Sequence, residues 1–327
     1  MLNAVIIGCG QIAGGYDAGR DADALPLTHA AAYVRDGGYR LLACVDPDAA
    51  QRDAFAARWG VEQALADVDA LGELSDRIDV ISICSPTALH AAHLEAALAL
   101  KPKLVFCEKP LTGSVAESEA IVARFAEAGV LLCVNHNRAW APDMVALAAD
   151  LKSGRHGALR SVTAIYTKGI FNNGSHMIDL LHRLIGPMRV VAAGRAVHDF
   201  WPDDPTIPAL LETATGVPVH LTTAHAGDYA LFELTLVTQR GVFSMTDGGR
   251  GWRERRIEDS VDFPGYRVLG AVRDSEGGYD AAMLAAVANI RDAIASGLPL
   301  ASDGSTALEA QRFCQAIRDA AMAQAPI

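Results

Sequence analysis

Residues 4–13 have the sequence AVIIGCGQIA, in which an apolar run ends in a Gly-x-Gly-x-x-Ala turn. The apolar run predicts a buried strand, and Gly8 permits the tight turn that follows it. Gly10 lets the backbone approach a pyrophosphate, and Ala13 is small enough for a helix to pack closely on the strand. The segment therefore predicts a dinucleotide-binding fold.

An acidic residue follows the second predicted strand, at residues 41–45. Asp46 stands where a carboxylate can accept hydrogen bonds from a ribose diol and repel a 2′-phosphate. We therefore expect NAD as the cofactor, with NADP less favoured, because Arg52 leaves that alternative open. A turn or cap role for Asp46 before Pro47 is compatible with ribose binding.

The spacing of this fingerprint is unusual. Asp46 lies 38 positions after Gly8, whereas the usual fingerprint places its acidic residue about 20 positions on. The excess lies in residues 14–27, whose Gly, Asp and Ala content predicts a loop that breaks the first helix. Thr28 is predicted to cap a resumed helix over residues 29–36. The loop could cover the cofactor, border the substrate or be a tolerated surface insertion.

The composition is that of a globular protein with two domains. The chain has 327 residues, of which 51% are hydrophobic and 20% charged. A net charge of −11 argues against binding to nucleic acid or to an anionic membrane. No apolar run is long enough to span a bilayer and no basic segment precedes the first strand, so we expect a cytoplasmic protein without a membrane segment.

Two groups of residues bear on other kinds of chemistry. The six cysteines show no CxxC spacing, which predicts small buried residues in a reducing compartment and no metal site or disulfide. Four arginines surround Trp252. This basic cluster could be the solvated end of a hairpin or could hold a substrate phosphate or carboxylate; its members are Arg250, Arg253, Arg255 and Arg256.

The pattern of elements changes near residue 137. Before it, short apolar strands alternate with Ala-rich helices, which predicts an α/β Rossmann domain with a doubly wound parallel sheet over residues 1–137. After it, alternating segments and helices predict an α+β domain over residues 138–327 with an open, mostly antiparallel sheet. One face of that sheet would be covered by helices, and the other is a plausible interface for a homodimer or homotetramer.

Polar residues follow the predicted strands of the first domain, at the edge where open parallel sheets bind ligands. Ser85 and Pro86 form a turn that can lie against the cofactor, with His90 on the next helix. Lys109 follows Glu108 directly after a strand, where a lysine can exchange a proton with a hydroxyl group during its oxidation. Taken alone, His90 could be an ordinary helix histidine and Lys109 an ordinary surface lysine.

A third segment lies in the second domain. His176 and Asp179 are three positions apart at the start of a predicted helix, so they share a face. His182 lies about 120° around that helix from His176, which argues against a shared metal site. His176 could also be a helix cap or a core histidine.

Taken in order, these segments resemble the glucose-fructose oxidoreductase, inositol dehydrogenase and MocA family of nicotinamide-dependent sugar oxidoreductases. The resemblance covers nearly the whole chain. The matching motifs are Gly8-x-Gly10-x-x-Ala13, Asp46, Ser85-Pro86-x-x-x-His90, Glu108-Lys109-Pro110, Asn137-Arg138, Gly154 to Gly157 and His176-x-x-Asp179.

The resemblance implies roles for individual residues. Lys109 and His176 would be catalytic and would handle the hydroxyl proton while hydride moves. Cofactor contacts would come from the Gly8 turn and the strand ends, and substrate contacts from the second domain and its border. The implied cofactor residues are Gly8, Gly10, Gln11, Ile12, Asp46, Ser85, Pro86, His90 and Glu108, and the implied substrate residues are Asn172, Asp179 and Arg138.

One position departs from the pattern of the family. Many polyol-oxidising members have an aspartate four residues before the histidine, where this chain has Asn172. An amide cannot raise the basicity of the histidine as a carboxylate does, so Lys109 is the better proton carrier. Asparagine here is similar to the branch acting on nucleotide-linked sugars of surface-polysaccharide pathways. Free sugars or inositols, and a non-catalytic regulator such as the family's galactose-pathway repressor, remain alternatives.

Overall fold

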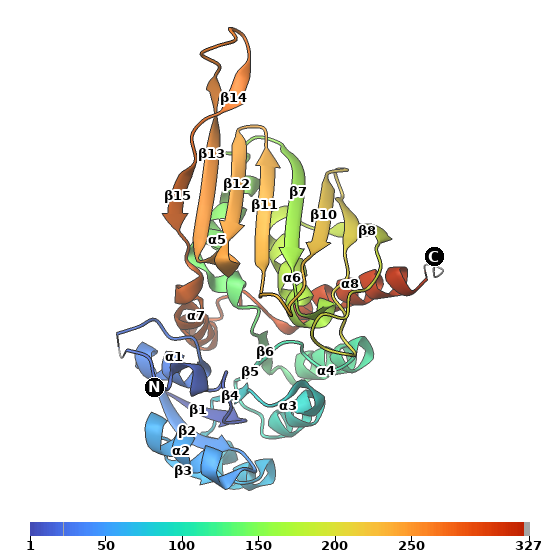
Figure 1. The fold of residues 1–327 in the computed structure, drawn as a ribbon. Coiled ribbons are helices and arrows are strands. Elements are labelled where there is room, and N and C mark those ends of the chain that lie inside the picture. Colours follow the sequence, from blue (N-terminus) through green and yellow to red (C-terminus); the bar gives the residue numbers. More distant parts are fainter. Residues whose placement is uncertain (22, 324–327) are drawn as a thin grey trace. The chain divides into compact units, whose positions relative to one another are not determined.

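The computed structural model describes residues 1–21 and 23–323, so Ala22 of the predicted loop and the last four residues lie outside the described ranges. The chain divides into two compact units (Figure 1). The first comprises Met1–Trp140 and Asp280–Glu309, and the second comprises Ala141–Tyr279 and the described residues from Ala310 onward. Residues 280–309, which the sequence analysis placed in the second domain, thus pack with the first unit.

The first unit contains the predicted doubly wound parallel sheet. Its strand order is β3-β2-β1-β4-β5-β6, and every neighbouring pair is parallel, which confirms the Rossmann prediction. The sequence analysis missed only β3, because three residues are too few for a pattern. The strands are β1 (Leu2–Ile7), β2 (Tyr39–Val45), β3 (Gln63–Leu65), β4 (Val80–Ile83), β5 (Leu104–Cys107) and β6 (Leu131–Val134).

Helices cover both faces of this sheet. In β1, Ile6 packs into a core cluster with Tyr33 and Ile290, whereas its neighbour Ile7 packs into a second cluster with Phe125. Successive strand residues thus enter opposite cores, as a sheet buried on both faces requires. The helices of this unit are α1 (His29–Asp36), α2 (Ala49–Trp59), α3 (His90–Ala99), α4 (Val115–Ala128) and α7 (Ala282–Ser296), and α8 (Gly304–Met322) begins in it.

The predicted break in the first helix is confirmed, but its cap is a different residue. After Gly10 the chain makes a helical turn and a short 3-10 helix, Gly15–Asp17, and α1 begins at His29. The hydroxyl of Thr28 does not cap α1, because it donates to Oδ2 of Asp17 instead. That carboxylate oxygen also accepts from the backbone N–H groups of Leu27 and Thr28. Asp17 therefore anchors the inserted loop and the start of α1.

The second unit is built on a mostly antiparallel sheet, as predicted. The strand order is β14-β13-β12-β11-β7-β10-β9-β8, β15 pairs with β13, and β7 with β10 is the parallel pair. The strands are β7 (Leu159–Tyr166), β8 (Met188–Ala193), β9 (Ala209–Thr213), β10 (Pro218–Thr223), β11 (Phe232–Thr238), β12 (Gly241–Thr246), β13 (Gly251–Asp259), β14 (Arg267–Leu269) and β15 (Arg273–Glu276).

One face of this second sheet is covered. The helices α5 (Pro142–Lys152) and α6 (Ser175–Ile185) lie on the same side of it (Figure 1). In β11 and β12, buried residues such as Leu234 and Leu236 alternate with partly exposed ones such as Thr235. This alternation is what a sheet with one covered face requires.

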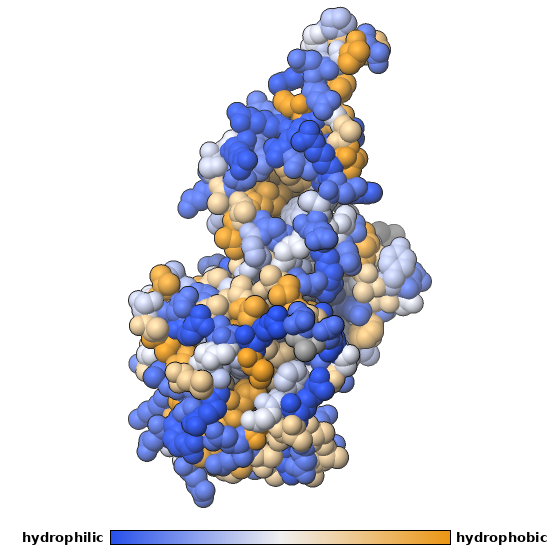
Figure 2. Space-filling model, turned by 90° about the vertical axis from the view of Figure 1, so that its left-hand side faces the viewer, coloured by the Kyte–Doolittle hydropathy of each residue, from blue (hydrophilic) through white to orange (hydrophobic). Residues whose placement is uncertain are grey.

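The β13–β14 hairpin extends beyond the rest of the sheet (Figure 1). Apolar side chains at its tip are exposed among polar ones (Figure 2), and they include Val261 and Phe263. The arginines predicted near Trp252 lie mostly on β13. Arg253 pairs with Asp274 of β15, and Arg255 donates to the carbonyls of Leu269 and Gly270. Those two arginines therefore hold the strands of the extension together.

Two further findings concern the whole described chain. All six cysteines are buried and have free thiols, as predicted. Within residues 1–21 and 23–323, no helix combines the length and apolar character needed to cross a membrane.

Candidate active site

The turn after β1 is closely packed on one side and open on the other. Gly8 has a φ of +89°, and a Cβ there would lie 2.7 Å from the backbone N of Ser85. Only glycine tolerates both the positive φ and this close approach. A Cβ at Gly10 would meet nothing within 4 Å. The Gly10 side of the turn is therefore open to a ligand, while Ala13 is fully buried.

Asp46 contacts this turn directly. Its Oδ2 accepts 2.8 Å hydrogen bonds from the backbone N–H of Cys9 and from Nε2 of Gln51, and its Oδ1 accepts from the N–H of Asp48. The guanidinium of Arg52 donates to the backbone carbonyl of Asp46 at 2.9 Å. The carboxylate thus both caps its own turn and closes the glycine turn, and Oδ1 keeps capacity for a further donor.

The turn after β4 is held by two histidines. His93 Nδ1 lies 2.8 Å from the hydroxyl oxygen of Ser85. His90 is buried. Its Nε2 lies 2.9 Å from the carbonyl oxygen of Ser85, and its Nδ1 lies 2.9 Å from the carbonyl oxygen of Pro110. His90 therefore joins the Ser85 turn to the segment after β5. The direct cofactor contact that the sequence analysis assigns to His90 stays a prediction, as does that of the exposed Pro86.

Glu108 is the centre of a buried polar cluster at the end of β5. Its Oε1 lies 3.0 Å from Nε2 of His29 and accepts a 2.6 Å hydrogen bond from Nδ2 of Asn135. Burial raises the pKa of a carboxyl group, but the hydrogen bonds from His29 and Asn135 and the charge of Lys109 together outweigh it. The pKa of Glu108 therefore lies below its usual range, and the group is a carboxylate. Lys109 follows it and is half-buried.

Sequence reasoning missed two members of this cluster. Asn135 directly follows β6, and the rule that ligands gather at the carboxyl ends of parallel strands would have found it. His29 carried no comparable signal. Its place in the cluster depends on the inserted loop. Asp17 in that loop accepts a hydrogen bond from the N–H of Thr28, and α1 begins at the next residue, His29.

In the second unit, two aspartates hold the segment before α6. Asp204 accepts 2.9 Å hydrogen bonds from the N–H groups of Phe171 and Asn172. Asp199 accepts from the N–H of Lys168, at the other end of the segment. Gly169 has a φ of +84°, and a Cβ there would overlap the Asp204 carboxylate. These contacts position Asn172 just before the helix that carries His176.

His176 lies in the first turn of α6 and Asp179 three residues further on, and both are buried. Asp179 is paired with Arg183, whose Nε and Nη2 donate to its two oxygens at 2.7 and 2.8 Å. This bidentate pair orients Asp179 within its own helix. Among the described residues, no group of three or more His, Cys, Asp or Glu side chains is arranged to hold a metal ion.

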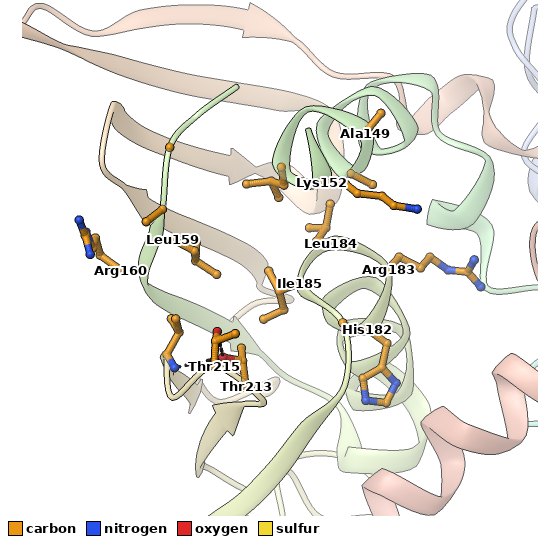
Figure 3. Close-up of a pocket in the computed structure, with 16 residues that line it drawn as sticks. Ala149, Lys152, Leu159, Arg160, His182, Arg183, Leu184, Ile185, Thr213 and Thr215 are labelled. Atoms are coloured by element: carbon orange, nitrogen blue, oxygen red, sulfur yellow. Dashed lines mark hydrogen bonds between the residues drawn. The ribbon is translucent and has the colours of Figure 1, made fainter. Parts of the chain in front are cut away.

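A pocket of about 820 Å³ in the second unit includes Arg183, the partner of Asp179, in its lining. It is lined by the ends of α5 and α6, the start of β7 and the β9–β10 turn (Figure 3). Asn172, His176 and Asp179 do not line it. Arg183, one of its lining residues, points away from the apolar side chains Leu159 and Ile185.

The predicted site residues fall into two groups. The first unit brings together the Gly8 turn, Asp46, Ser85 and Glu108 with Lys109, and it also contains the buried Arg138, which follows β6 in a 3-10 helix. The second unit contains Asn172, His176 and Asp179. The two candidate catalytic residues thus come from different units.

Comparisons with known proteins identify relatives of this chain. Residues 2–136 match the family model described as "Oxidoreductase family, NAD-binding Rossmann fold". Inositol 2-dehydrogenase from Rhizobium meliloti (strain 1021) is 28% identical over 222 residues, which cover 62% of this chain and 66% of that protein. The matched part thus spans slightly less than two thirds of this relative.

Solved structures share the fold over nearly the whole chain. The WlbA dehydrogenase from Bordetella pertussis, in complex with NADH and UDP-GlcNAcA, has a TM-score of 0.75 at 18% identity and covers 100% of this chain and 99% of its own. A 3-ketoreductase from Actinomadura kijaniata, in complex with TDP-benzene and NADP, has a TM-score of 0.76 at 21% identity. The match covers 98% of this chain and 97% of that chain. Over residues 2–136 the chain is thus similar to the glucose-fructose oxidoreductase, inositol dehydrogenase and MocA family, whose model describes an NAD-binding Rossmann fold.

Proposed function

We propose that this protein transfers hydride between NAD(H) and a hydroxyl or ketone carbon of a sugar. The observation that carries the proposal is the set of residues at the carboxyl edge of the six-stranded sheet. There the open Gly10 turn, the Asp46 carboxylate and the Glu108-Lys109 pair follow strands β1, β2 and β5. This edge is where parallel sheets of this order bind dinucleotides.

The residues present fit a nicotinamide dinucleotide. The open side of Gly10 leaves room for a pyrophosphate, and Oδ1 of Asp46 can accept from a ribose hydroxyl. The guanidinium of Arg52, which could neutralise a 2′-phosphate, already contacts the Asp46 carbonyl at 2.9 Å and the Asp53 carboxylate at 3.5 Å. These contacts support NAD(H) over NADP(H).

The bound cofactor supplies the hydride chemistry, and the protein supplies orientation and a proton path. Glu108, a buried carboxylate, accepts from the nicotinamide ribose. Lys109 takes the proton from the substrate hydroxyl during oxidation, or returns it during ketone reduction. Because Asn172 stands where a carboxylate would raise the basicity of His176, we assign the proton to Lys109 and a hydrogen-bonding role to His176. Asn172, Asp179 and Arg138 border the substrate.

For the substrate we favour nucleotide-linked sugars over free sugars or inositols. Asn172 supports this choice, and so does the likeness to the WlbA dehydrogenase, whose complex holds NADH and UDP-GlcNAcA. The relation to inositol 2-dehydrogenase supports the alternative. We further propose a cytoplasmic homodimer or homotetramer associated through the uncovered face of the second sheet; six free thiols support the reducing compartment.

The test is a substrate screen with purified protein. The absorbance of NADH and NADPH is followed with panels of nucleotide-linked sugars, free sugars and inositols, and mass spectrometry of the mixtures detects shifts of two hydrogens. Turnover with one nucleotide-linked sugar is expected, and Lys109→Ala should remove it. Cofactor binding without turnover of any panel would favour a regulator, and absence of cofactor binding would contradict the proposal.

A further inference from the structure

His29 lies beneath the candidate cofactor site at the centre of a chain of polar groups. It is fully buried at the first position of α1. Its Nε2 lies 3.0 Å from Oε1 of Glu108, and its Nδ1 lies 3.1 Å from the hydroxyl of Ser82. The Ser82 oxygen in turn lies 2.7 Å from the hydroxyl of Tyr33. The chain therefore runs from Tyr33 through Ser82 and His29 to Glu108.

One consistent set of protons satisfies every member of this chain. Burial raises the pKa of Tyr33 well above its usual value, so its hydroxyl keeps its proton and can donate to Ser82. Ser82 can then donate to Nδ1 of His29, and Nε2–H donates to Glu108. This arrangement leaves the imidazole in a single tautomer, with its donor directed at the carboxylate.

The two oxygens of Glu108 differ in what they can still accept. Oε1 takes both the His29 and the Asn135 contact. Among the described residues, the contact recorded for Oε2 is a long one of 3.3 Å from the backbone N–H of Lys109. Because a carboxylate oxygen has two lone pairs, Oε1 is filled by the protein and Oε2 is the one available to a ligand.

We propose that His29 is a positioning residue for cofactor binding: its buried hydrogen bond to Oε1 fixes Glu108 as a carboxylate whose Oε2 is presented to the nicotinamide ribose. This inference rests on the proposed function. It also gives the inserted loop a role, because the Asp17 carboxylate holds Thr28, the residue directly before His29 at the start of α1.

The groups around Glu108 make the effect of His29 specific. The titratable groups that interact with the carboxylate are His29 of α1, the adjacent Lys109, and the thiols of Cys84 and Cys107. Burial raises the pKa of both thiols, so they carry no charge at neutral pH. Burial raises the pKa of Glu108, and the hydrogen bond from His29 lowers it. Without His29 the pKa would therefore rise, and the carboxyl group would take up a proton at higher pH.

Two substitutions separate the contacts of His29. In His29→Gln, the side-chain amide can reach the position of Nε2 and keep a hydrogen bond to Glu108. In His29→Asn, the shorter side chain can reach only the position of Nδ1, so it keeps the contact with Ser82 and loses the one with Glu108. Both lose the ring that packs against Phe106, so they are matched for lost packing. The probe is NADH alone, titrated by fluorescence between about pH 5.5 and 8, a range that spans a raised carboxyl pKa. Thermal unfolding checks that each variant is folded.

For the wild type and His29→Gln, the dissociation constant of NADH should be nearly independent of pH. For His29→Asn it should rise about tenfold at neutral pH, the effect of one charged hydrogen bond, and further as the pH falls and Glu108 is protonated. In the double variant His29→Asn with Glu108→Gln, the dependence on pH should disappear, because no carboxylate is left to titrate.

Equal binding by wild type and His29→Asn at every pH would overturn the inference, as would equal losses in the two single variants. Should His29→Asn fail to fold, His29→Gln still decides: a loss of affinity that grows as the pH falls would contradict the role assigned to its donor, and a flat profile would support it. A wild type that binds neither NADH nor NADPH would instead contradict the proposed function and this inference together.

Discussion

The backbone N–H of Cys9 donates a 2.8 Å hydrogen bond to Oδ2 of Asp46, 37 positions later in the chain. The residue expected to recognise the ribose therefore also closes the turn expected to hold the pyrophosphate. The two halves of the dinucleotide fingerprint are joined before any ligand is present, so changing Asp46 should affect both parts of the cofactor.

Asp46→Asn should weaken NADH binding about tenfold or more, because hydrogen bonds to a charged group contribute about 1.5–3 kcal/mol. The affinity for NADPH should fall less, since the charge that repels a 2′-phosphate is removed. Dissociation constants of both cofactors, measured by fluorescence, check this prediction. Asp48→Asn is the matched control: Asp48 is exposed and caps α2, a role that asparagine performs equally well. Equal effects of the two substitutions would exclude a specific role for Asp46.

Lys109→Ala should lower the turnover number by roughly 10² to 10⁴, the range for loss of a general acid or base. The affinity for NADH should change little, because Glu108 and its donors remain. Steady-state kinetics with the substrate found in the screen, beside a cofactor titration, separate these effects. Lys103→Ala removes an exposed lysine at the start of β5 that pairs with Asp79, and it should leave turnover unchanged. An unaltered rate in Lys109→Ala would remove the lysine from proton transfer.

His90→Leu should lower the free energy of unfolding by about 2–4 kcal/mol, because it leaves the carbonyls of Ser85 and Pro110 buried without their donors. Denaturant unfolding measures the change. His93→Leu, which loses one contact to a hydroxyl, is expected to cost less than about 1 kcal/mol. Similar losses in both variants would show that His90 has no special bridging role.

Asp199→Asn should destabilise the protein at neutral pH, and the difference from wild type should shrink in acid. Burial raises the pKa of Asp199, but the N–H groups of Lys168 and Ala226 and the hydroxyl of Thr206 outweigh it and hold the pKa below the usual range. A depressed carboxyl pKa adds stability above the unfolded-state value, about 3.9, which is lost as the pH falls through the folded-state value. Unfolding by denaturant at several pH values checks this. The exposed Asp203, changed to Asn, should show no such dependence.

The strands of the first unit could be predicted from the sequence because most of them are short apolar runs. The residues that follow these runs then indicated where the candidate site lies. Apolar runs of four or more residues predicted β1, β4 and β5, and the residues directly after them supplied Gly8, Ser85 and Glu108. Strands β3, β9, β13, β14 and β15 were missed, and two of them, β3 and β13, show why. The first has only three residues, and the second is an arginine-rich strand whose side chains bind neighbouring strands instead of entering a core.

Local chemistry in the sequence thus determined the class of fold, the dinucleotide turn and the candidate proton carrier Lys109, because each depends on residue types at short spacing. Only the tertiary structure decided that Asp17 anchors the inserted loop and that His29 reaches Glu108, 79 positions away. It also decided that residues 280–309 pack with the first unit. These contacts join segments far apart in the chain, and their geometry depends on how the loop and the helices pack, which no spacing in the sequence records.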